Sequence, residues 1–196
     1  MSNFQESLQE AVAVFEALKE HECTVQIAAE WCVQALLRDC KILICGNGGS
    51  ASQSQHLAGE LMGRYRKNRR PLAAIALGTD AAVLTCISND FCYEEIFARQ
   101  IRALAAAGDI VIVFTTSGNS PNIVAALRAA RQIDVRSIAF LGSDGGQAKS
   151  LADCSLLVRN SDTARAQEGH QFLMHCLMDQ IETGISESTD RRNFGS

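Results

Sequence analysis

The sequence predicts an α/β fold: a doubly wound, three-layer arrangement in which helices cover both faces of a five-stranded parallel sheet. Five short apolar segments rich in β-branched residues alternate with longer segments of helical periodicity. No repeat, low-complexity region or second unit interrupts this alternation. We therefore expect one domain over residues 1–196.

A helical hairpin is expected ahead of the sheet, over about residues 3–38. Apolar residues recur at helical spacing from Phe4 to Leu18, and the spacing resumes from Val25 to Leu37. The residues between, at 21–23, break the pattern. Such a hairpin often packs on the sheet or on another subunit.

The α/β core is expected over about residues 40–186. The predicted strands are 42–45, 72–77, 110–114, 137–141 and 155–158, and the main helices between them are about 50–62, 81–88, 93–106 and 122–132. A last long helix is predicted from an N-cap at 161–163 to about residue 186. The polar tail, about 187–196, is predicted to be disordered.

Composition argues against several classes of function. The formal net charge of −4 gives no general attraction to nucleic acid or to an anionic membrane. No apolar run approaches the ~18 residues of a membrane span, and the N-terminus does not resemble a signal peptide. Eight cysteines without a CxxC pair read as reduced core residues. We expect a cytoplasmic protein with no nucleic-acid or membrane partner.

Three polar loops follow predicted strands, at residues 46–50, 78–80 and 115–120. Ligands of open parallel sheets bind at the carboxyl ends of the strands. The first loop joins a strand to a helix through three glycines, so its backbone N–H groups can hold an anion. It matches neither the Walker P-loop nor the dinucleotide fingerprint.

The loop TTSGNS carries four hydroxyls, on Thr115, Thr116, Ser117 and Ser120. Hydroxyls next to a helix N-terminus make a phosphate cradle that needs no Lys or Arg. A simple N-cap turn is the alternative, but one hydroxyl would suffice for it.

Two helices carry candidate acid, base or metal groups. His56 and Glu60 are four residues apart, so they share one helix face and can ligate a metal ion or exchange protons. The alternative is the polar face of an amphipathic helix. The last helix adds His175, which lies beside an apolar stripe and would by itself be read as a core histidine. The basic run 67–70 is expected to be a solvated loop, with a phosphate or partner contact as the alternative.

Four segments in this order resemble the phosphoheptose isomerases, which are SIS-domain (sugar isomerase) proteins. They are CGNGGS…HLAGELMGRY, SND at 88–90, TTSGNSPN, and DTARAQE followed by a histidine. The resemblance extends to about residue 183. It implies a homotetrameric aldose–ketose isomerase that converts sedoheptulose 7-phosphate to D-glycero-D-manno-heptose 7-phosphate through an enediolate. This is the first step of heptose supply for lipopolysaccharide or other surface glycans.

The resemblance also implies roles for individual residues. Glu60 is the expected general base and His175 the expected general acid. The expected Zn²⁺ ligands are His56, Glu60, Gln167 and His175. The expected substrate-binding residues are Asn47, Gly48, Gly49, Ser50, Glu60, Asn89, Asp90, Thr115, Thr116, Ser117, Ser120 and Gln167.

Other functions stay open at the level of sequence. A non-catalytic SIS protein that binds a replication-initiation protein is disfavoured because Glu60 and His175 are both present. A sugar-phosphate-binding regulator, or an isomerase acting on another sugar phosphate, would keep the phosphate loop. The expected ligand set poses one geometric difficulty: Gln167 and His175 are eight residues apart, ~12 Å along a helix, which is near the limit for two side chains that bind one ion.

Overall fold

The computed structural model describes residues 3–193, and side chains as far as residue 188. Eight α-helices, two short 3-10 helices and five strands make up this part of the chain. They are α1 (Phe4–Ala17), η1 (Leu18–His21), α2 (Glu22–Leu37), β1 (Ile42–Gly46), α3 (Gly49–Met62), β2 (Ala74–Ala76), α4 (Ala81–Asp90), η2 (Tyr93–Glu95), α5 (Ala98–Leu104), β3 (Ile110–Thr115), α6 (Pro121–Gln132), β4 (Arg136–Gly142), α7 (Ala148–Leu151), β5 (Cys154–Val158) and α8 (Thr163–Asn193).

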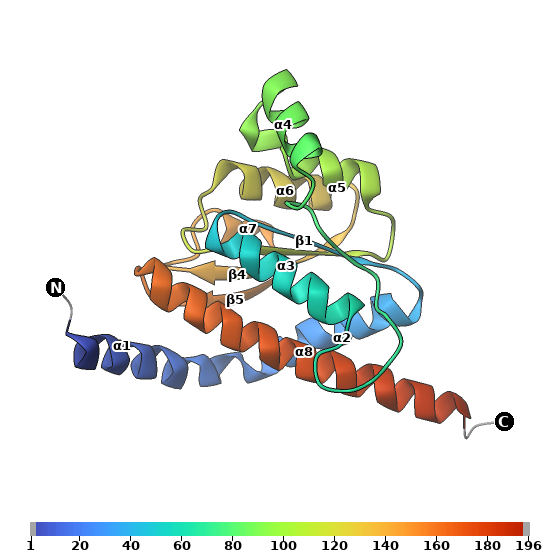
Figure 1. Cartoon of the computed structure of the whole chain (residues 1–196), viewed down its shortest axis with the longest axis horizontal. Coiled ribbons are helices and arrows are strands. Elements are labelled where there is room, and N and C mark those ends of the chain that lie inside the picture. The colour runs from blue at the N-terminus through green and yellow to red at the C-terminus, as the bar shows by residue number, and fades with distance from the viewer. Residues whose placement is uncertain (1–2, 194–196) are drawn as a thin grey trace.

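The predicted doubly wound sheet is confirmed. All strand pairs are parallel, in the order β2-β1-β3-β4-β5. The order reverses at β1, and the neighbouring loops after β1 and β3 therefore open at the same edge. Figure 1 shows α3 and α8 running side by side over one face of the sheet, with α5 and α6 on the other side.

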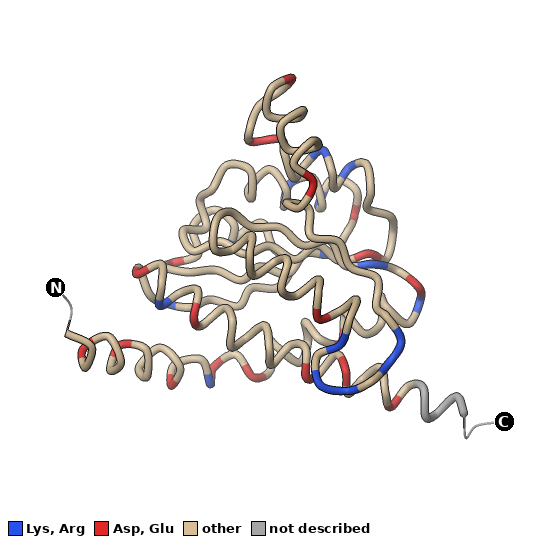
Figure 2. The backbone as a smooth tube through the Cα atoms, viewed as in Figure 1, with Lys and Arg blue, Asp and Glu red and all other residues tan. Residues whose placement is uncertain are grey.

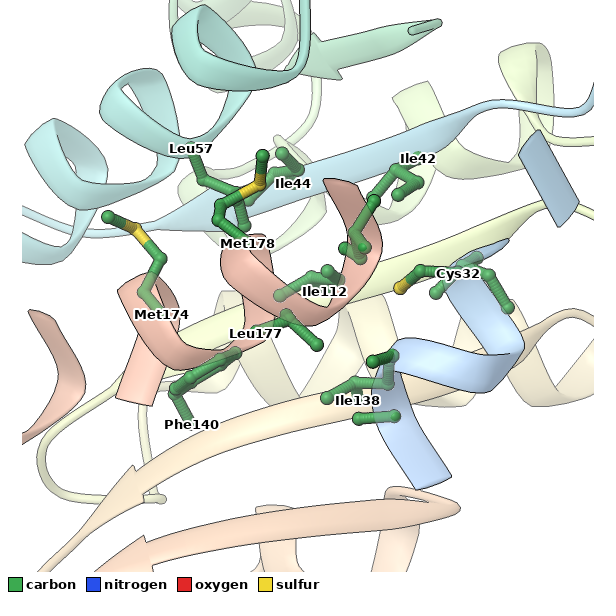
Figure 3. Packing of buried hydrophobic residues seen from close by; sticks show 14 of the residues in the cluster. Cys32, Ile42, Ile44, Leu57, Ile112, Ile138, Phe140, Met174, Leu177 and Met178 are labelled. Carbon is green, nitrogen blue, oxygen red and sulfur yellow. The ribbon is translucent and has the colours of Figure 1, made fainter. Parts of the chain in front are cut away.

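Strand residues alternate between two hydrophobic clusters, one on each face of the sheet. Ile42 and Ile44 of β1 pack with α2, α3 and α8, whereas Leu43 and Cys45 pack with α5 and α6. Strands buried on both faces explain the continuous apolar runs in the sequence. Figure 3 shows the first cluster, in which Leu177 and Met178 of α8 lie over the sheet.

The N-terminal helices do not form the expected hairpin. One 3-10 turn, η1, joins α1 to α2, and the cap residues at both of its ends keep right-handed helical dihedrals. The chain therefore continues instead of reversing, and both helices pack on α8 (Figure 1).

The last helix is longer than the sequence predicts. The expectation of a disordered tail from about residue 187 is corrected for residues 187–193, where α8 continues; residues 194–196 lie outside the described part. Extending a formed helix adds one hydrogen bond for each residue that is fixed. The hydroxyls of Ser186 and Ser188 also bond to carbonyls within the helix.

Two further expectations are adjusted. The helix predicted over 93–106 is divided into η2 and α5. Three of the eight cysteines, Cys23, Cys86 and Cys92, are exposed rather than in the core. Within residues 3–193, no helix combines the length and apolar character that crossing a bilayer requires.

Candidate functional site

A polar pocket lies at the carboxyl ends of β1 and β3. The loops after these strands meet there with the first turns of α3, α6 and α8. The residues that line it are Asn47, Gly48, Gly49, Ser50, Phe114, Thr115, Thr116, Ser120, Thr163 and Gln167. Eight of these ten residues are ones that the sequence analysis named as substrate-binding candidates, and that role stays a prediction.

Glycines allow the first loop to approach α8. Gly48 has φ 56° and ψ −122°, a conformation that side chains disfavour. A Cβ on Gly49 would lie 2.5 Å from the side-chain nitrogen of Gln167. Gln167 therefore packs directly on the loop, and Gln53 Nε2 donates to its backbone carbonyl at 2.8 Å.

The four hydroxyls of the second loop differ in their surroundings. Thr115 is buried, and its Oγ1 accepts from Gly118 N at 3.2 Å. Thr116 and Ser120 line the pocket. Ser120 is the N-cap of α6, and its side chain makes no capping bond within the described chain. Ser117 is exposed, does not line the pocket, and its Oγ accepts from Asn119 N.

Asn47 is fixed by residues that sequence reasoning missed. Its amide exchanges two hydrogen bonds with the amide of Asn122, each 2.8 Å long. The hydroxyl of Tyr93 also donates to Asn47 Oδ1, at 3.1 Å. Asn122 is the last residue of the TTSGNSPN segment, so its position near Ser120 could have marked it as a site residue. Nothing in the sequence around Tyr93, in η2, indicated that it would reach the site.

Farther along α3 and α8, three side chains converge. His56 Nε2 lies 3.0 Å and His175 Nε2 lies 3.6 Å from Glu60 Oε1. One potential ligand atom from each residue falls within 4.8 Å of the others, so the group can hold a metal ion. Glu60 Oε2 is buried and has no hydrogen-bond partner in the described chain, which leaves a free anionic ligand. Two imidazoles and a carboxylate suit Zn²⁺.

Two neighbours complete this group. Gln171 Nε2 lies 3.2 Å from His56 Nδ1 and 3.0 Å from His175 Nε2. The Tyr65 ring stacks on the His175 ring, with centroids 5.5 Å apart. The sequence contained a signal for Gln171, which precedes His175 by four residues and so shares its helix face.

Gln167 lies at the pocket, eight residues before His175 on α8, which is the separation that strained the expected ligand set. Its role as a metal ligand stays a prediction. Asn89 and Asp90 do not line the pocket: they end α4, which projects from the top of the molecule in Figure 1, and they bond to each other.

His170 is the histidine that belongs to the core. It is fully buried, and its ring lies edge-on to Phe114 and Phe140, with centroids 6.1 and 6.2 Å away. Burial lowers its pKa to about 4, so it is neutral at neutral pH.

Comparison with known proteins identifies the family. The SIS domain model matches residues 6–142. A phosphoheptose isomerase of Trichlorobacter lovleyi is 47% identical over 180 residues, which are 91% of each chain. The chain belongs to the phosphoheptose isomerase family.

Solved phosphoheptose isomerases have the same architecture. The enzyme of Neisseria gonorrhoeae aligns with a TM-score of 0.86 and 39% identity, covering 92% of this chain and all of that one. The enzyme of Francisella tularensis gives a TM-score of 0.84 and 36% identity, covering 92% and 94%.

Proposed function

We propose that the protein interconverts sedoheptulose 7-phosphate and D-glycero-D-manno-heptose 7-phosphate, the first step of heptose supply for lipopolysaccharide or other surface glycans. One observation carries this proposal within the family: Glu60 and His175 lie side by side on two helices that both begin at a polar pocket suited to phosphate. An acid and a base at a distance from a phosphate anchor are what an aldose–ketose isomerase needs.

The pocket would bind the phosphate. Thr116 and Ser120 offer hydroxyls, and α3 and α6 begin beside them, so the positive ends of two helix dipoles favour an anion there. Asn47, whose amide is held by Asn122, would bind the sugar hydroxyls next to the loop. Binding the far end of the substrate in this way orients its reacting carbons.

Glu60 would move the proton between the two reacting carbons, and His175 would donate to and accept from the neighbouring oxygen. Glu60 Oε2 has no partner in the described chain, so it is free to take the proton. Tyr65 holds the His175 ring by stacking on it, which fixes the direction of the donated proton.

Zn²⁺ fits the group formed by His56, Glu60 and His175. Bound there, it would supply Lewis-acid stabilisation of negative charge on the sugar oxygens. Gln171 is placed to complete the ligand set or to orient the two histidines. Gln167, which lines the pocket, would contact the substrate and, as the family resemblance implies, would also bind Zn²⁺.

The assay that tests this function uses purified protein and sedoheptulose 7-phosphate, with and without a chelator. We expect isomerisation that stops on chelation and returns when Zn²⁺ is restored. A sugar-phosphate-binding regulator would bind the substrate without converting it, and an isomerase for another sugar would convert that sugar instead. Absence of turnover with Zn²⁺ present would refute the proposed activity.

The remaining expectations form part of the same proposal. The chain would act as one domain in the cytoplasm, on a small sugar phosphate, without nucleic-acid or membrane partners. It would also assemble as a homotetramer. An exposed apolar stripe on α1 supports assembly: Phe4, Leu8 and Val12 are 76%, 50% and 49% exposed.

We expect Leu8→Glu to lower the molar mass in solution from tetramer to smaller species, because the charge would have to be buried at the interface. Light scattering after size exclusion measures this. Gln9→Glu, at the neighbouring exposed position, is the matched control and should leave the tetramer intact. An unchanged mass for Leu8→Glu would exclude this stripe as an interface.

A further inference from the structure

A buried ion pair joins the loop after α3 to the middle of α8. The side chains of Arg69 and Glu182 are 5% and 2% exposed, and Arg69 Nε lies 3.2 Å from Glu182 Oε1. Arg69 belongs to the basic run expected to be solvated, and that expectation is wrong for this residue. Figure 2 shows the basic loop lying beside α8. Burying two charges is unfavourable unless both find further partners.

Glu182 finds its partners in the backbone of this loop. Its carboxylate accepts from the N–H groups of Tyr65, Arg66 and Lys67, each at 3.0 Å. Burial raises the pKa of Glu182, but these three donors and Arg69 outweigh burial and lower the pKa below its ordinary value. Glu182 is therefore a charged group that fixes the path of the loop.

Arg69 finds its partners at the end of α3. Its guanidinium donates to the backbone carbonyls of Glu60 at 2.6 Å and Leu61 at 2.8 Å, and to that of Gly63 at 3.2 Å. These carbonyls lie in the last turn of the helix or just beyond it, where no N–H of the helix is available to them. A cation is also favoured there by the helix dipole.

Both ends of this network touch the reacting groups. Arg69 holds the backbone of Glu60 itself. Glu182 holds the backbone of Tyr65, whose ring stacks on His175. Glu182 also follows His175 by seven residues, two helical turns, on the same face of α8. The pair thus links the two helices one turn or more beyond the site.

We propose that Arg69 and Glu182 are positioning residues that set the separation of Glu60 and His175. This inference rests on the proposed function for its catalytic consequence. A misplacement of ~1 Å in a site of this kind lowers the rate by ~10²-fold. The phosphate pocket lies at the N-terminal ends of the two helices, away from the pair, so its affinity would not depend on the pair.

The test compares Glu182→Gln with a matched buried pair elsewhere. Asp109 is also 2% exposed, lies 2.6 Å from Lys41 Nζ, and accepts from the N–H groups of Lys41 and Ala106. It lies at the start of β3, away from the pocket. Glu182→Gln removes one charge of a buried ion pair and should lower the free energy of unfolding. Asp109→Asn should lower it in the same way without affecting the site.

We expect Glu182→Gln to lower kcat by ~10- to 100-fold with KM changed less than ~3-fold, at a temperature where both variants are folded. Asp109→Asn should keep kcat. Arg69→Lys keeps the charge but removes the guanidinium that donates to three carbonyls, and it should also lower kcat. If Glu182→Gln does not fold, Arg69→Lys is used for the test in its place. Equal kcat in the unchanged protein and in the folded variants would overturn the proposal.

A second measurement does not depend on turnover. The three candidate metal ligands come from α3 and α8, so a shift between these helices should weaken Zn²⁺ binding by ~10-fold or more. Competition with a chromophoric chelator measures this for each variant. If the unchanged protein has no isomerase activity, the proposed function fails, while Zn²⁺ affinity still decides the positioning role. Unchanged affinity in both pair variants would contradict that role.

Discussion

Glu60→Gln is expected to lower kcat by at least ~10³-fold while the protein stays folded and still binds sugar phosphate. General base catalysis contributes up to ~10⁴-fold, and an amide cannot accept the proton. Gln has the length of Glu and can still contact His56, which lies 3.0 Å from the carboxylate. The loss should therefore fall on turnover and on metal binding rather than on the fold.

Three measurements check this result: steady-state kinetics, sugar-phosphate binding by calorimetry, and the melting temperature. Glu30→Gln makes the same chemical change at an exposed position of α2 and should leave all three unchanged. Full activity in Glu60→Gln would remove Glu60 from the proposed mechanism. Loss of both binding and folding would indicate a structural role instead.

The double variant Thr116→Val with Ser120→Ala is expected to lower kcat/KM by ~10²-fold or more. A hydrogen bond to a charged group contributes about 1.5–3 kcal/mol, so losing two removes at least ~3 kcal/mol. Both hydroxyls line the pocket. Thr115 also lines it, but its side chain is buried and supports the loop by accepting from Gly118 N, so it is left unchanged. The fold should survive because neither changed side chain is in the core.

Inhibition by inorganic phosphate gives an independent measure, since its affinity should fall with that of the substrate. Thr85→Val with Ser150→Ala removes the same groups at exposed positions of α4 and α7 and serves as the matched control. If phosphate binds the double variant as tightly as the unchanged protein, the phosphate site lies elsewhere.

Short continuous apolar runs between helical segments were sufficient to predict the sheet, because strands buried on both faces must be apolar at every position. Ile42 to Cys45 illustrate this: successive residues enter different clusters, yet none is polar. The N-terminal region was harder. Helical spacing located α1 and α2, but the direction taken at η1 depends on packing against α8, which lies far away in sequence.

The candidate site was predictable where it depends on loops and helix faces. Spacing placed His56 beside Glu60, and resemblance added His175. Neither spacing nor resemblance could place Tyr65, because its irregular backbone is held by the carboxylate of Glu182, which is 117 residues away. Composition likewise marked residues 67–70 as basic but could not show that Arg69 folds back onto the carbonyls at the end of α3.

Because α3 and α8 both begin at the pocket and run side by side, they fix the distance between the pocket and the proposed reacting groups. His56 lies seven residues beyond Gly49, ~10 Å along the helix at 1.5 Å per residue. With C–C bonds of about 1.5 Å, each carbon removed from a substrate anchored by its phosphate shortens its reach by ~1.3 Å. On the proposed roles, pentose and hexose phosphates would bind at the pocket yet hold their carbonyl carbons short of Glu60. Selection for chain length would then appear in turnover and not in affinity.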